Sequence, residues 1–344
     1  MAFQLSTILP PSPRSRDSLI LIENTGSSPW LQLLQSSLTY LKGVTIVVVC
    51  VLYPAEDILP KTLGLTRVRV VDRTDDIPGY QDGENGIEEA VLRVLDEVPE
   101  KDPVVLIVDS ADTICEDKQS HSATYNILKA WHANVLKRPS PSRLILPLRS
   151  NSRLLPLLIT PSFSSSLVHL ILHPPATLQN LAADYLTLPP PHSSAPKFWP
   201  IFSGLSTRGE GERLLWGANG AGWGDEVVVE ILIRSASGKR TVDRTLEGWR
   251  RSGPSTLEDL EELKQIWSRV GTQQLMTNDT PDPMQNLPFN LSLTEAQQQS
   301  RAQVPLPYAH EGQPTASVAA GSILYDPDSA DDIDEDDPDE DLDI

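Results

Sequence analysis

The sequence predicts an α/β fold, with a largely parallel sheet flanked by helices and an antiparallel hairpin at one edge of that sheet. Short apolar runs alternate with helix-like segments over residues 17–172, which is the order that builds parallel sheets. Two of these runs, 44–52 and 104–108, are apolar almost throughout, as strands buried on both faces are. Residues 226–246 then form two strand-like segments around a Gly-containing turn, which predicts the hairpin.

The elements of the first half follow in order. Strands are predicted at 19–22, 44–52, 67–72, 104–108, 144–148 and 167–172, because Val, Ile and Leu are concentrated there. Helices are predicted at 30–41, 87–98 and 124–136. The first two place apolar side chains on one helix face. These residues are Trp30, Leu33, Leu34, Leu38 and Leu41, then Ile87, Val91, Val94 and Leu95.

The second half begins with a segment rich in Pro and Ser. From this composition we expect residues 139–200 to form long loops on the sheet rather than a new core. In the hairpin, the first strand at 226–234 is apolar at alternate positions, and residues 235–238 turn the chain into a second strand at 239–246. Residues 255–259 offer overlapping capping boxes to a helix. The apolar stripe of that helix is Leu257, Leu260, Leu263, Ile266 and Trp267.

Composition divides the chain into five segments. They are an N-terminal extension (1–16), the α/β domain (17–270), a polar, Pro-containing linker (271–288), a docking segment (289–308) and a disordered acidic tail (309–344). The docking segment is apolar at alternate positions from Phe289 to Leu293 and ends on a second apolar run at Tyr308. Such a segment, isolated between polar ones, must bury its face against its own domain or another chain.

The negative charge of the chain is concentrated at its C-terminus. There are 28 Lys+Arg and 47 Asp+Glu, a formal charge of −19. Residues 326–344 contain 12 Asp+Glu and no Lys or Arg, so the other 325 residues carry 28 − 35 = −7. This balance argues against the chain binding nucleic acid alone, but a nearly neutral body can still contribute to an RNA-binding assembly.

Cysteine content and the length of apolar runs indicate a cytoplasmic and nuclear protein. The two cysteines, Cys50 and Cys115, cannot make a disulfide framework, and Cys50 lies in an apolar run as a small buried hydrophobe would. Residues 1–13 lack a basic region followed by an apolar stretch. The longest apolar run, 44–52, is too short to cross a bilayer, so we expect no membrane association.

The segment after the first strand stands where a phosphate-binding loop would. Such a loop needs two Gly, a Lys and a Ser or Thr at fixed spacing to reach phosphate and magnesium. Residues 24–30, Asn-Thr-Gly-Ser-Ser-Pro-Trp, have one Gly and no Lys, and Pro29 offers no amide donor. Asp109 follows strand 104–108, where a magnesium-associated Asp lies in P-loop enzymes. Without the cradle, a strand-terminal or capping role is favoured for Asp109.

The residues suggest no catalytic, cofactor-binding or metal-binding site. His169 and His173 share a strand face, but no Cys or acidic third ligand is nearby, which favours ordinary packing. Residues 217–224 are Gly-rich but lead into a strand, which favours a connecting turn. No Gly-x-Ser-x-Gly elbow marks a nucleophile. The basic stretch 137–143 is favoured as a solvated loop over an RNA contact or a transport signal.

Motifs near the C-terminus resemble the Elongator complex protein 5 family. They are Phe-Asn-Leu-Ser-Leu-Thr-Glu at 289–295, Arg-Ala-Gln-Val-Pro-Leu-Pro-Tyr at 301–308, Ile-Leu-Tyr-Asp-Pro-Asp at 323–328 and Asp-Pro-Asp-Glu-Asp-Leu-Asp-Ile at 337–344. The resemblance implies a RecA-like subunit without a phosphate-binding loop, joining the fourth and sixth Elongator proteins in a heterohexameric ring. It further implies that the ring binds tRNA, is associated with ATP hydrolysis that loosens it, and docks on the larger assembly. The separate catalytic subunit of that assembly modifies the wobble uridine of tRNA at carbon 5.

Together, the residues and the resemblance favour a non-catalytic ring subunit without a cofactor of its own, whose docking segment packs against a ring neighbour. Two other functions stay open. One is a self-sufficient ATPase with an atypical nucleotide site, in which Asp109 would be essential. The other is an inert domain whose acidic tail, 326–344, binds basic proteins such as histones.

Overall fold

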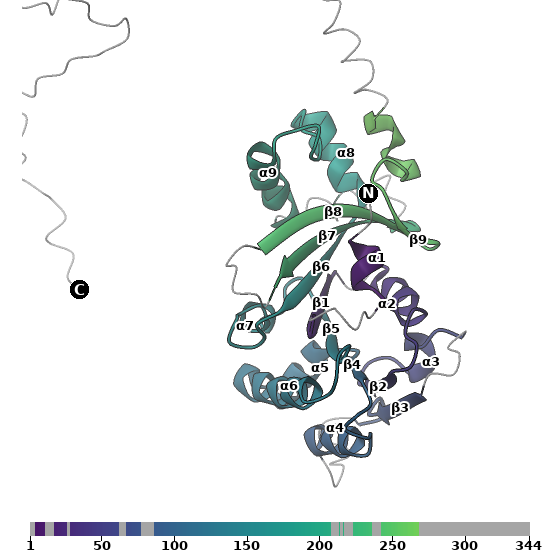
Figure 1. Ribbon diagram of the computed structural model, residues 1–344. Coiled ribbons are helices and arrows are strands. Elements are labelled where there is room, and N and C mark those ends of the chain that lie inside the picture. Colours follow the sequence, from purple (N-terminus) through teal and green to yellow (C-terminus); the bar gives the residue numbers. More distant parts are fainter. Residues whose placement is uncertain are drawn as a thin grey trace, which may run out of the picture. The chain divides into compact units, whose positions relative to one another are not determined.

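One nine-stranded sheet organises the part of the chain that the computed structural model describes (Figure 1). The described residues are 4–10, 17–25, 28–61, 67–76, 86–207, 213, 216, 223–235 and 242–267. The chain divides into two units, Met1–Asn278 and Asp279–Ile344, and all described residues lie in the first. The predicted linker, docking segment and acidic tail lie outside the described residues.

The order of the strands confirms the predicted sheet. Across it the order is β3-β2-β4-β5-β1-β6-β7-β8-β9, parallel from β3 to β6 and antiparallel from there to β9. Ile20 pairs with Ile145 on one side and Val168 on the other. The bounds are β1 (Leu19–Asn24), β2 (Thr45–Cys50), β3 (Arg67–Asp72), β4 (Val104–Val108), β5 (Arg143–Arg149), β6 (Leu167–His173), β7 (Glu226–Arg234), β8 (Val242–Arg250) and β9 (Gly253–Ser255).

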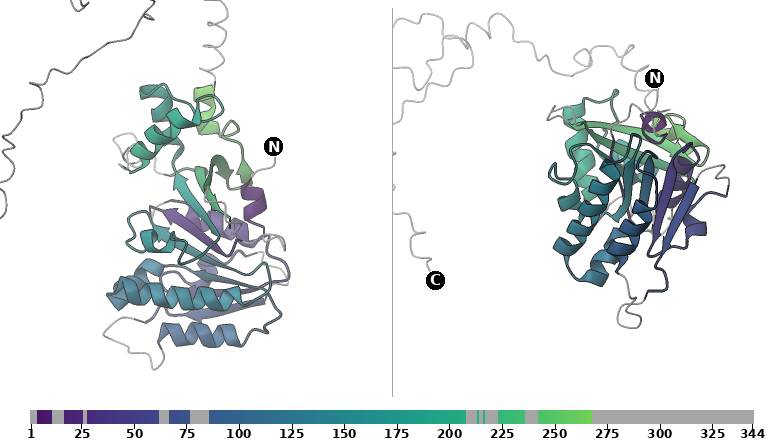
Figure 2. Two further views of the ribbon diagram at one scale, coloured as in Figure 1. Left: turned by 60° about the vertical axis from the view of Figure 1, so that its left-hand side comes forward. Right: turned by 60° about the horizontal axis from the view of Figure 1, so that its bottom comes forward.

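Helices cover both faces of the sheet (Figures 1 and 2). One face carries α1 (Leu5–Ile8), α2 (Trp30–Leu38) and α3 (Ala55–Ile58). The other carries α4 (Ile87–Asp96), α5 (Ala111–Lys118), α6 (His121–Leu136) and α7 (Leu155–Leu158). Beyond them, α8 (Pro175–Asp184) and α9 (Ala195–Thr207) lie together beside the antiparallel strands. The expectation of a sheet flanked by helices is therefore confirmed.

Strand β2 shows how the sheet is buried on both sides. Ile46 and Val48 belong to the core on one face, whereas Val47 and Val49 belong to the core on the other. Cys50 is fully buried at the end of the strand, and burial, with the negative charges of Asp109 and Asp72, raises the pKa of its thiol to about 12. The prediction of a small buried hydrophobe at this position is confirmed.

Helix α5 has no counterpart in the sequence prediction. Its sequence, Ala-Asp-Thr-Ile-Cys-Glu-Asp-Lys, is mostly polar and has too few apolar positions for a helical stripe to stand out. The hydroxyl of Ser110 accepts a hydrogen bond from the backbone N–H of Thr113 at 3.2 Å, so a side-chain cap begins the helix. The sequence signal for the start of this helix was its capping residue, Ser110.

Apart from the strands predicted within it, residues 139–200 were expected to form long loops rather than a new core, and this prediction is wrong. Helices α8 and α9 lie largely within this segment. They build a third core with the face of β7 that carries Val228 and with the chain after β9. Pro174 and Pro175 stand at the start of α8, where the missing amide hydrogen costs no helical bond. Pro200 lies inside α9. The core residues are Leu178, Leu181, Phe198, Phe202, Leu205, Val228, Leu260, Leu263 and Ile266.

The chain after β9 differs from the predicted helix. Residues 256–259 form a turn, followed by the 3₁₀ helix η1 (Glu261–Leu263) and one helical turn over 264–267. The predicted apolar stripe is still buried, because Leu260, Leu263 and Ile266 enter the third core. The second hairpin strand also differs, since β8 begins at Val242 and ends at Arg250.

Residues 4–10 of the predicted N-terminal extension pack against the body. Leu5, Ile8 and Leu9 are buried in the same core as β1 and β2. The Glu247 carboxylate accepts the backbone N–H groups of residues 4 and 5, at 2.6 and 3.0 Å. At the other end of α1, the Arg143 guanidinium donates to the carbonyls of residues 8 and 9, and its burial lowers its pKa to about 10.

Candidate functional site

Asp109 caps the loop that follows β2. Its buried carboxylate accepts hydrogen bonds from the backbone N–H groups of Val51 at 2.9 Å, Leu52 at 2.7 Å and Tyr53 at 2.7 Å. Burial raises the pKa of Asp109, while these donors act in the opposite direction. Both carboxylate oxygens are engaged by amides, so this arrangement uses Asp109 as a structural cap, the role that the sequence favoured.

A pocket with both polar and apolar lining residues lies outside the carboxyl ends of β1, β5 and β6. Its volume is about 560 Å³. Strand β1 contributes Glu23 and Asn24, the chain after β5 contributes Asn151, and β6 contributes His169 and His173. The carboxyl ends of parallel strands are where open α/β sheets bind ligands, which makes this pocket the candidate functional site. Its wall on the antiparallel side comes from α9, β7 and β8.

Each histidine of the pocket faces a glutamate. His173 Nε2 lies 2.9 Å from Glu230 Oε2, and His169 Nε2 lies 3.0 Å from Glu23 Oε2. Strand pairing brings these carboxylates in from β1 and β7, which the sequence did not indicate, but no acidic third ligand joins the two histidines among the described residues. One signal was present. Glu230 is the charged residue in an otherwise apolar strand interior, and a buried charge in such a run is informative.

Glu230 holds the centre of a charged network. Arg244 donates from Nε to Glu230 Oε1 at 2.6 Å and from its terminal nitrogen to Ser203 Oγ at 2.9 Å, and its guanidinium lies 4.1 Å from the ring centroid of Trp199. Burial opposes ionisation of Glu230, but the hydrogen bonds and charges of His173 and Arg244 outweigh it and lower its pKa. The network joins β6, β7, β8 and α9 and keeps Glu230 ionised.

The geometry does not favour nucleophilic or metal chemistry at the pocket. Ser206 Oγ lies 3.4 Å from His173 Nδ1, longer than the contact of an activated nucleophile with its base. Glu230, which would orient the histidine, is also neutralised by Arg244. Among the described residues, no three His, Cys, Asp or Glu side chains gather as metal ligands. The described side chains of the pocket therefore form neither a close nucleophile–base pair nor a metal cluster.

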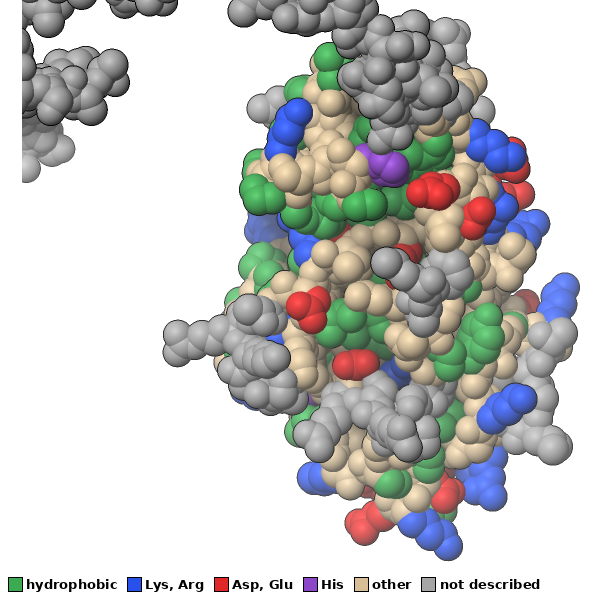
Figure 3. Space-filling view, turned by 45° about the horizontal axis from the view of Figure 1, so that its top comes forward, with side chains coloured by type: hydrophobic (Ala, Val, Ile, Leu, Met, Phe, Trp, Pro, Cys, Tyr) green, Lys and Arg blue, Asp and Glu red, His purple; other side chains and the backbone are tan. Residues whose placement is uncertain are grey.

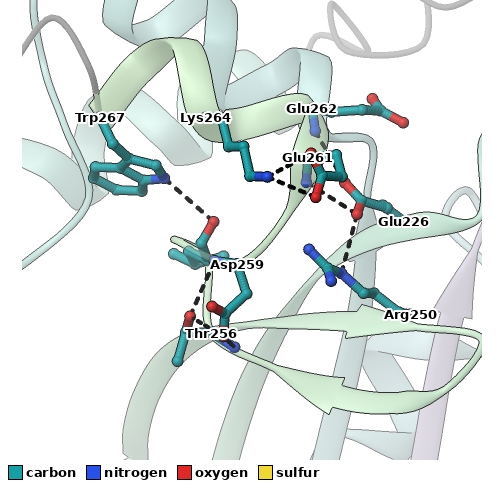
Figure 4. Close-up of polar contacts among 9 residues, drawn as sticks. Glu226, Arg250, Thr256, Asp259, Glu261, Glu262, Lys264 and Trp267 are labelled. Atoms are coloured by element: carbon teal, nitrogen blue, oxygen red, sulfur yellow. Dashed lines mark hydrogen bonds and ion pairs between the residues drawn. The ribbon is translucent and has the colours of Figure 1, made fainter.

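The turn after β9 is held to the sheet by a second polar cluster (Figure 4). Glu226, at the start of β7, accepts the backbone N–H groups of Glu261 and Glu262, both at 3.0 Å, and pairs with Arg250 Nε at 3.0 Å. Thr256 and Asp259 exchange bonds in the manner of a capping box, with Asp259 N–H donating to Thr256 Oγ1 at 3.1 Å. These contacts hold the turn and η1 against the start of β7 and the end of β8.

The remaining features that the sequence singled out lie outside the described lining of the pocket. Within 137–143, Arg138 donates to the carbonyls of Leu95 and Val98, each at 2.6 Å, so this side chain ties the loop to the end of α4. Residues 217–222 of the Gly-rich stretch lie outside the described residues, as do Gly26 and Ser27 after β1. No helix in the described part of the chain is long and apolar enough to cross a membrane.

Comparisons with known proteins bear on the C-terminal part. Residues 200–326 match the family model described as Elongator subunit Iki1. Over 68 residues the chain is 40% identical to Elongator complex protein 5 of Danio rerio, and over 70 residues it is 39% and 37% identical to those of Mus musculus and Homo sapiens. Each alignment covers 18% of this chain and 23% of the relative, so the chain spans less than a quarter of these proteins. The resemblance drawn from the C-terminal motifs is confirmed.

Two solved structures are similar over more of the chain. A KaiC-like protein from Pyrococcus horikoshii OT3 has a TM-score of 0.37 and 12% identity, covering 70% of this chain and 88% of that one. A DnaB-like replicative helicase, solved for its interactions with primase, has a TM-score of 0.33 and 9% identity, covering 70% of this chain and 57% of that one.

Proposed function

We propose that this chain, which carries the Elongator subunit Iki1 region at residues 200–326, is a non-catalytic structural subunit of the Elongator complex. The observation that carries the proposal is where that region falls on the fold. It begins in α9, includes β7, β8 and β9 with the anchored turn after them, and continues beyond residue 267. The matched region therefore joins the edge of the sheet to the predicted docking segment.

The proposed assembly is a heterohexameric ring with the fourth and sixth Elongator proteins, in which the docking segment packs against a neighbour. The matched region and the chain beside it expose apolar side chains that a ring neighbour would cover. Leu186 is 76% exposed, Trp216 61% and Val242 48%. From above α8 and α9, hydrophobic side chains lie beside acidic and basic ones (Figure 3), a mixture typical of non-obligate interfaces.

Catalysis belongs, in this proposal, to other subunits. The Asp109 carboxylate is occupied by three backbone amides, and the segment after β1 has no Lys to hold a phosphate. Binding of tRNA is proposed for the ring rather than for this chain alone, because its body carries a charge of 28 − 35 = −7 outside the tail. The ring then supports carbon-5 modification of the wobble uridine in the cytoplasm and nucleus.

The test is co-expression of the full chain with its two proposed ring partners, followed by size-exclusion chromatography with light scattering. Three versions of the chain are compared: the wild type, one lacking 289–308 and one lacking 326–344. We expect a mixed ring with the wild type and with the tail deletion, and loss of the ring when the docking segment is removed. Absence of any mixed assembly with the wild type would refute the proposal.

The same material separates the competing functions. A self-sufficient ATPase would hydrolyse ATP as the purified single chain and lose that activity in Asp109→Ala, whereas a structural subunit shows no turnover in either form. An acidic tail acting alone would bind basic proteins until residues 326–344 are removed, and its loss would leave the body without a partner.

A further inference from the structure

The pocket at the carboxyl ends of β1, β5 and β6 lies where chain connections leave the sheet in opposite directions. The helix after β1, α2, packs on one face through Leu33 and Leu34. The helices after β5 and β6, α7 and α8, pack on the other face through Leu158 and Leu178. Such divergence opens a crevice beside the central strand, which is the usual ligand position in open α/β sheets.

The crevice holds a Glu–His pair and a buried hydroxyl that has no partner among the described residues. His169 is 8% exposed, and its described partner is Glu23, whose Oε2 lies 3.0 Å from His169 Nε2. The hydroxyl of Thr25, two residues after Glu23 along the chain, is buried and has no hydrogen bond to the described residues. Both side chains line the pocket. Buried polar groups are otherwise hydrogen-bonded, so an unpartnered hydroxyl beside a Glu–His pair in one crevice points to a polar ligand.

The charges of the lining residues indicate the chemical class of that ligand. Both carboxylate oxygens of Glu230 are engaged, one by His173 and the other by Arg244. Arg244, the arginine of the pocket lining, is therefore already paired. Glu23 brings a second negative charge with only a histidine beside it. A phosphate group is therefore disfavoured. Among the described lining residues, Glu23 is the carboxylate left to accept a hydrogen bond from a ligand.

The remaining lining favours hydroxyl groups. It consists largely of side chains that both donate and accept, among them Asn24, Thr177 and Ser206. A carboxylate at the end of a strand binds ribose hydroxyls in α/β folds, because its two oxygens accept from neighbouring O–H groups. A volume of about 560 Å³ accommodates a nucleoside.

We propose that this pocket binds the cis-diol of a ribose, with Glu23 accepting from the diol and with Thr25 and His169 completing the contacts. The ligand is a nucleoside unit without phosphates at the diol, either a free nucleoside or the 3′-terminal residue of an RNA. The proposal stands independently of membership in the Elongator complex, because it rests on groups of this chain alone.

The test uses the full-length chain and ligand-observed NMR, with calorimetry for affinity. The probes are adenosine, 2′,3′-dideoxyadenosine and ATP. We expect adenosine to bind with the strongest saturation transfer on its ribose protons. Dideoxyadenosine should bind about tenfold more weakly, since the hydrogen bonds to a charged acceptor are lost. ATP should also bind more weakly than adenosine, because its phosphates enter a crevice of negative charge.

Two variants test the residues. Glu23→Gln and Thr25→Ala should each weaken adenosine binding, the former by about tenfold. The matched control is Glu89→Gln on the exposed side of α4, which should change nothing. Melting temperatures establish that each variant is folded, and Thr25→Ala decides the question if Glu23→Gln is unfolded. Unchanged affinity in a folded Thr25→Ala and a folded Glu23→Gln overturns the proposal.

A short RNA distinguishes the two sources of the diol. It is tested before and after periodate oxidation, which destroys the 3′-terminal cis-diol and leaves every phosphate in place. Binding of adenosine alone assigns the pocket to a free nucleoside. Binding of the RNA that is lost on oxidation assigns it to an RNA end. If adenosine and dideoxyadenosine bind equally, or neither adenosine nor the intact RNA binds, the proposal is wrong.

Discussion

Removing the Asp109 carboxylate should destabilise the chain strongly without changing any ATP hydrolysis. In Asp109→Ala, three backbone donors at Val51, Leu52 and Tyr53 lose their acceptor. A buried donor without a partner costs about 1–3 kcal/mol. Leu52 is 49% exposed, so water can reach the outer part of this loop. We therefore expect a total loss of about 3 kcal/mol in the free energy of unfolding.

The assay is urea unfolding at pH 7, followed by tryptophan fluorescence and circular dichroism. Asp109→Asn keeps one acceptor oxygen and should lose about half as much. The matched control is Asp96→Ala at the exposed end of α4, which should change stability by less than about 0.5 kcal/mol. A loss below about 1 kcal/mol in Asp109→Ala, or ATP turnover by the wild type that this variant abolishes, would refute the capping role.

Four further changes test other parts of the structure. Burial lowers the pKa of His132 to about 4 from 6.5, so its contribution to stability is present above pH 6.5 and is lost as the pH falls to 4. In His132→Gln, the decrease in the free energy of unfolding between pH 6.5 and pH 4 should be smaller by about 3 kcal/mol, as measured by urea titrations at a series of pH values. Glu230→Gln leaves Arg244 and His173 without their anion and should cost about 2 kcal/mol, measured by urea unfolding at pH 7. Gly248→Ala should cost about 1–3 kcal/mol in the same assay, because its Cβ would lie 2.7 Å from a backbone oxygen of the turn after β9. Glu226→Gln should change global stability by less than about 1 kcal/mol but speed limited proteolysis between residues 256 and 267, because two N–H bonds of that turn weaken.

The sheet was predictable because its strands are strongly patterned. Residues 67–72 and 104–108 were predicted with the bounds that β3 and β4 have, since each is a short β-branched run between turn residues. The hairpin face was also predictable, because alternation places Val227, Val229 and Ile231 in one core. Strand order across the sheet is a property of long-range pairing, which no local pattern carries.

The helices around the third core were missed for a physical reason. Proline usually indicates a loop, but α8 starts with a proline at its first helical position. A proline inside a segment usually indicates that no helix continues there, but α9 contains Pro200. The aromatic spacing of Phe198 and Phe202 was the competing signal, and burial against Val228 stabilises the helix despite its proline. Tertiary packing outweighed local propensity in this segment.

The sequence indicated some residues of the candidate site but not their partners. His169 and His173 stood out, but their carboxylate partners come from β1 and β7, far away along the chain. Asp109 was the reverse case, since its position suggested chemistry and its amide contacts reveal a cap. Composition identifies which residues are unusual, whereas strand pairing decides what each one faces.

The most direct test of the proposed ring is native mass spectrometry of this chain co-expressed with the fourth and sixth Elongator proteins. The account predicts one dominant species containing two copies of each of the three proteins. A mass corresponding to this chain alone, or to a complex in which it is absent, would contradict it.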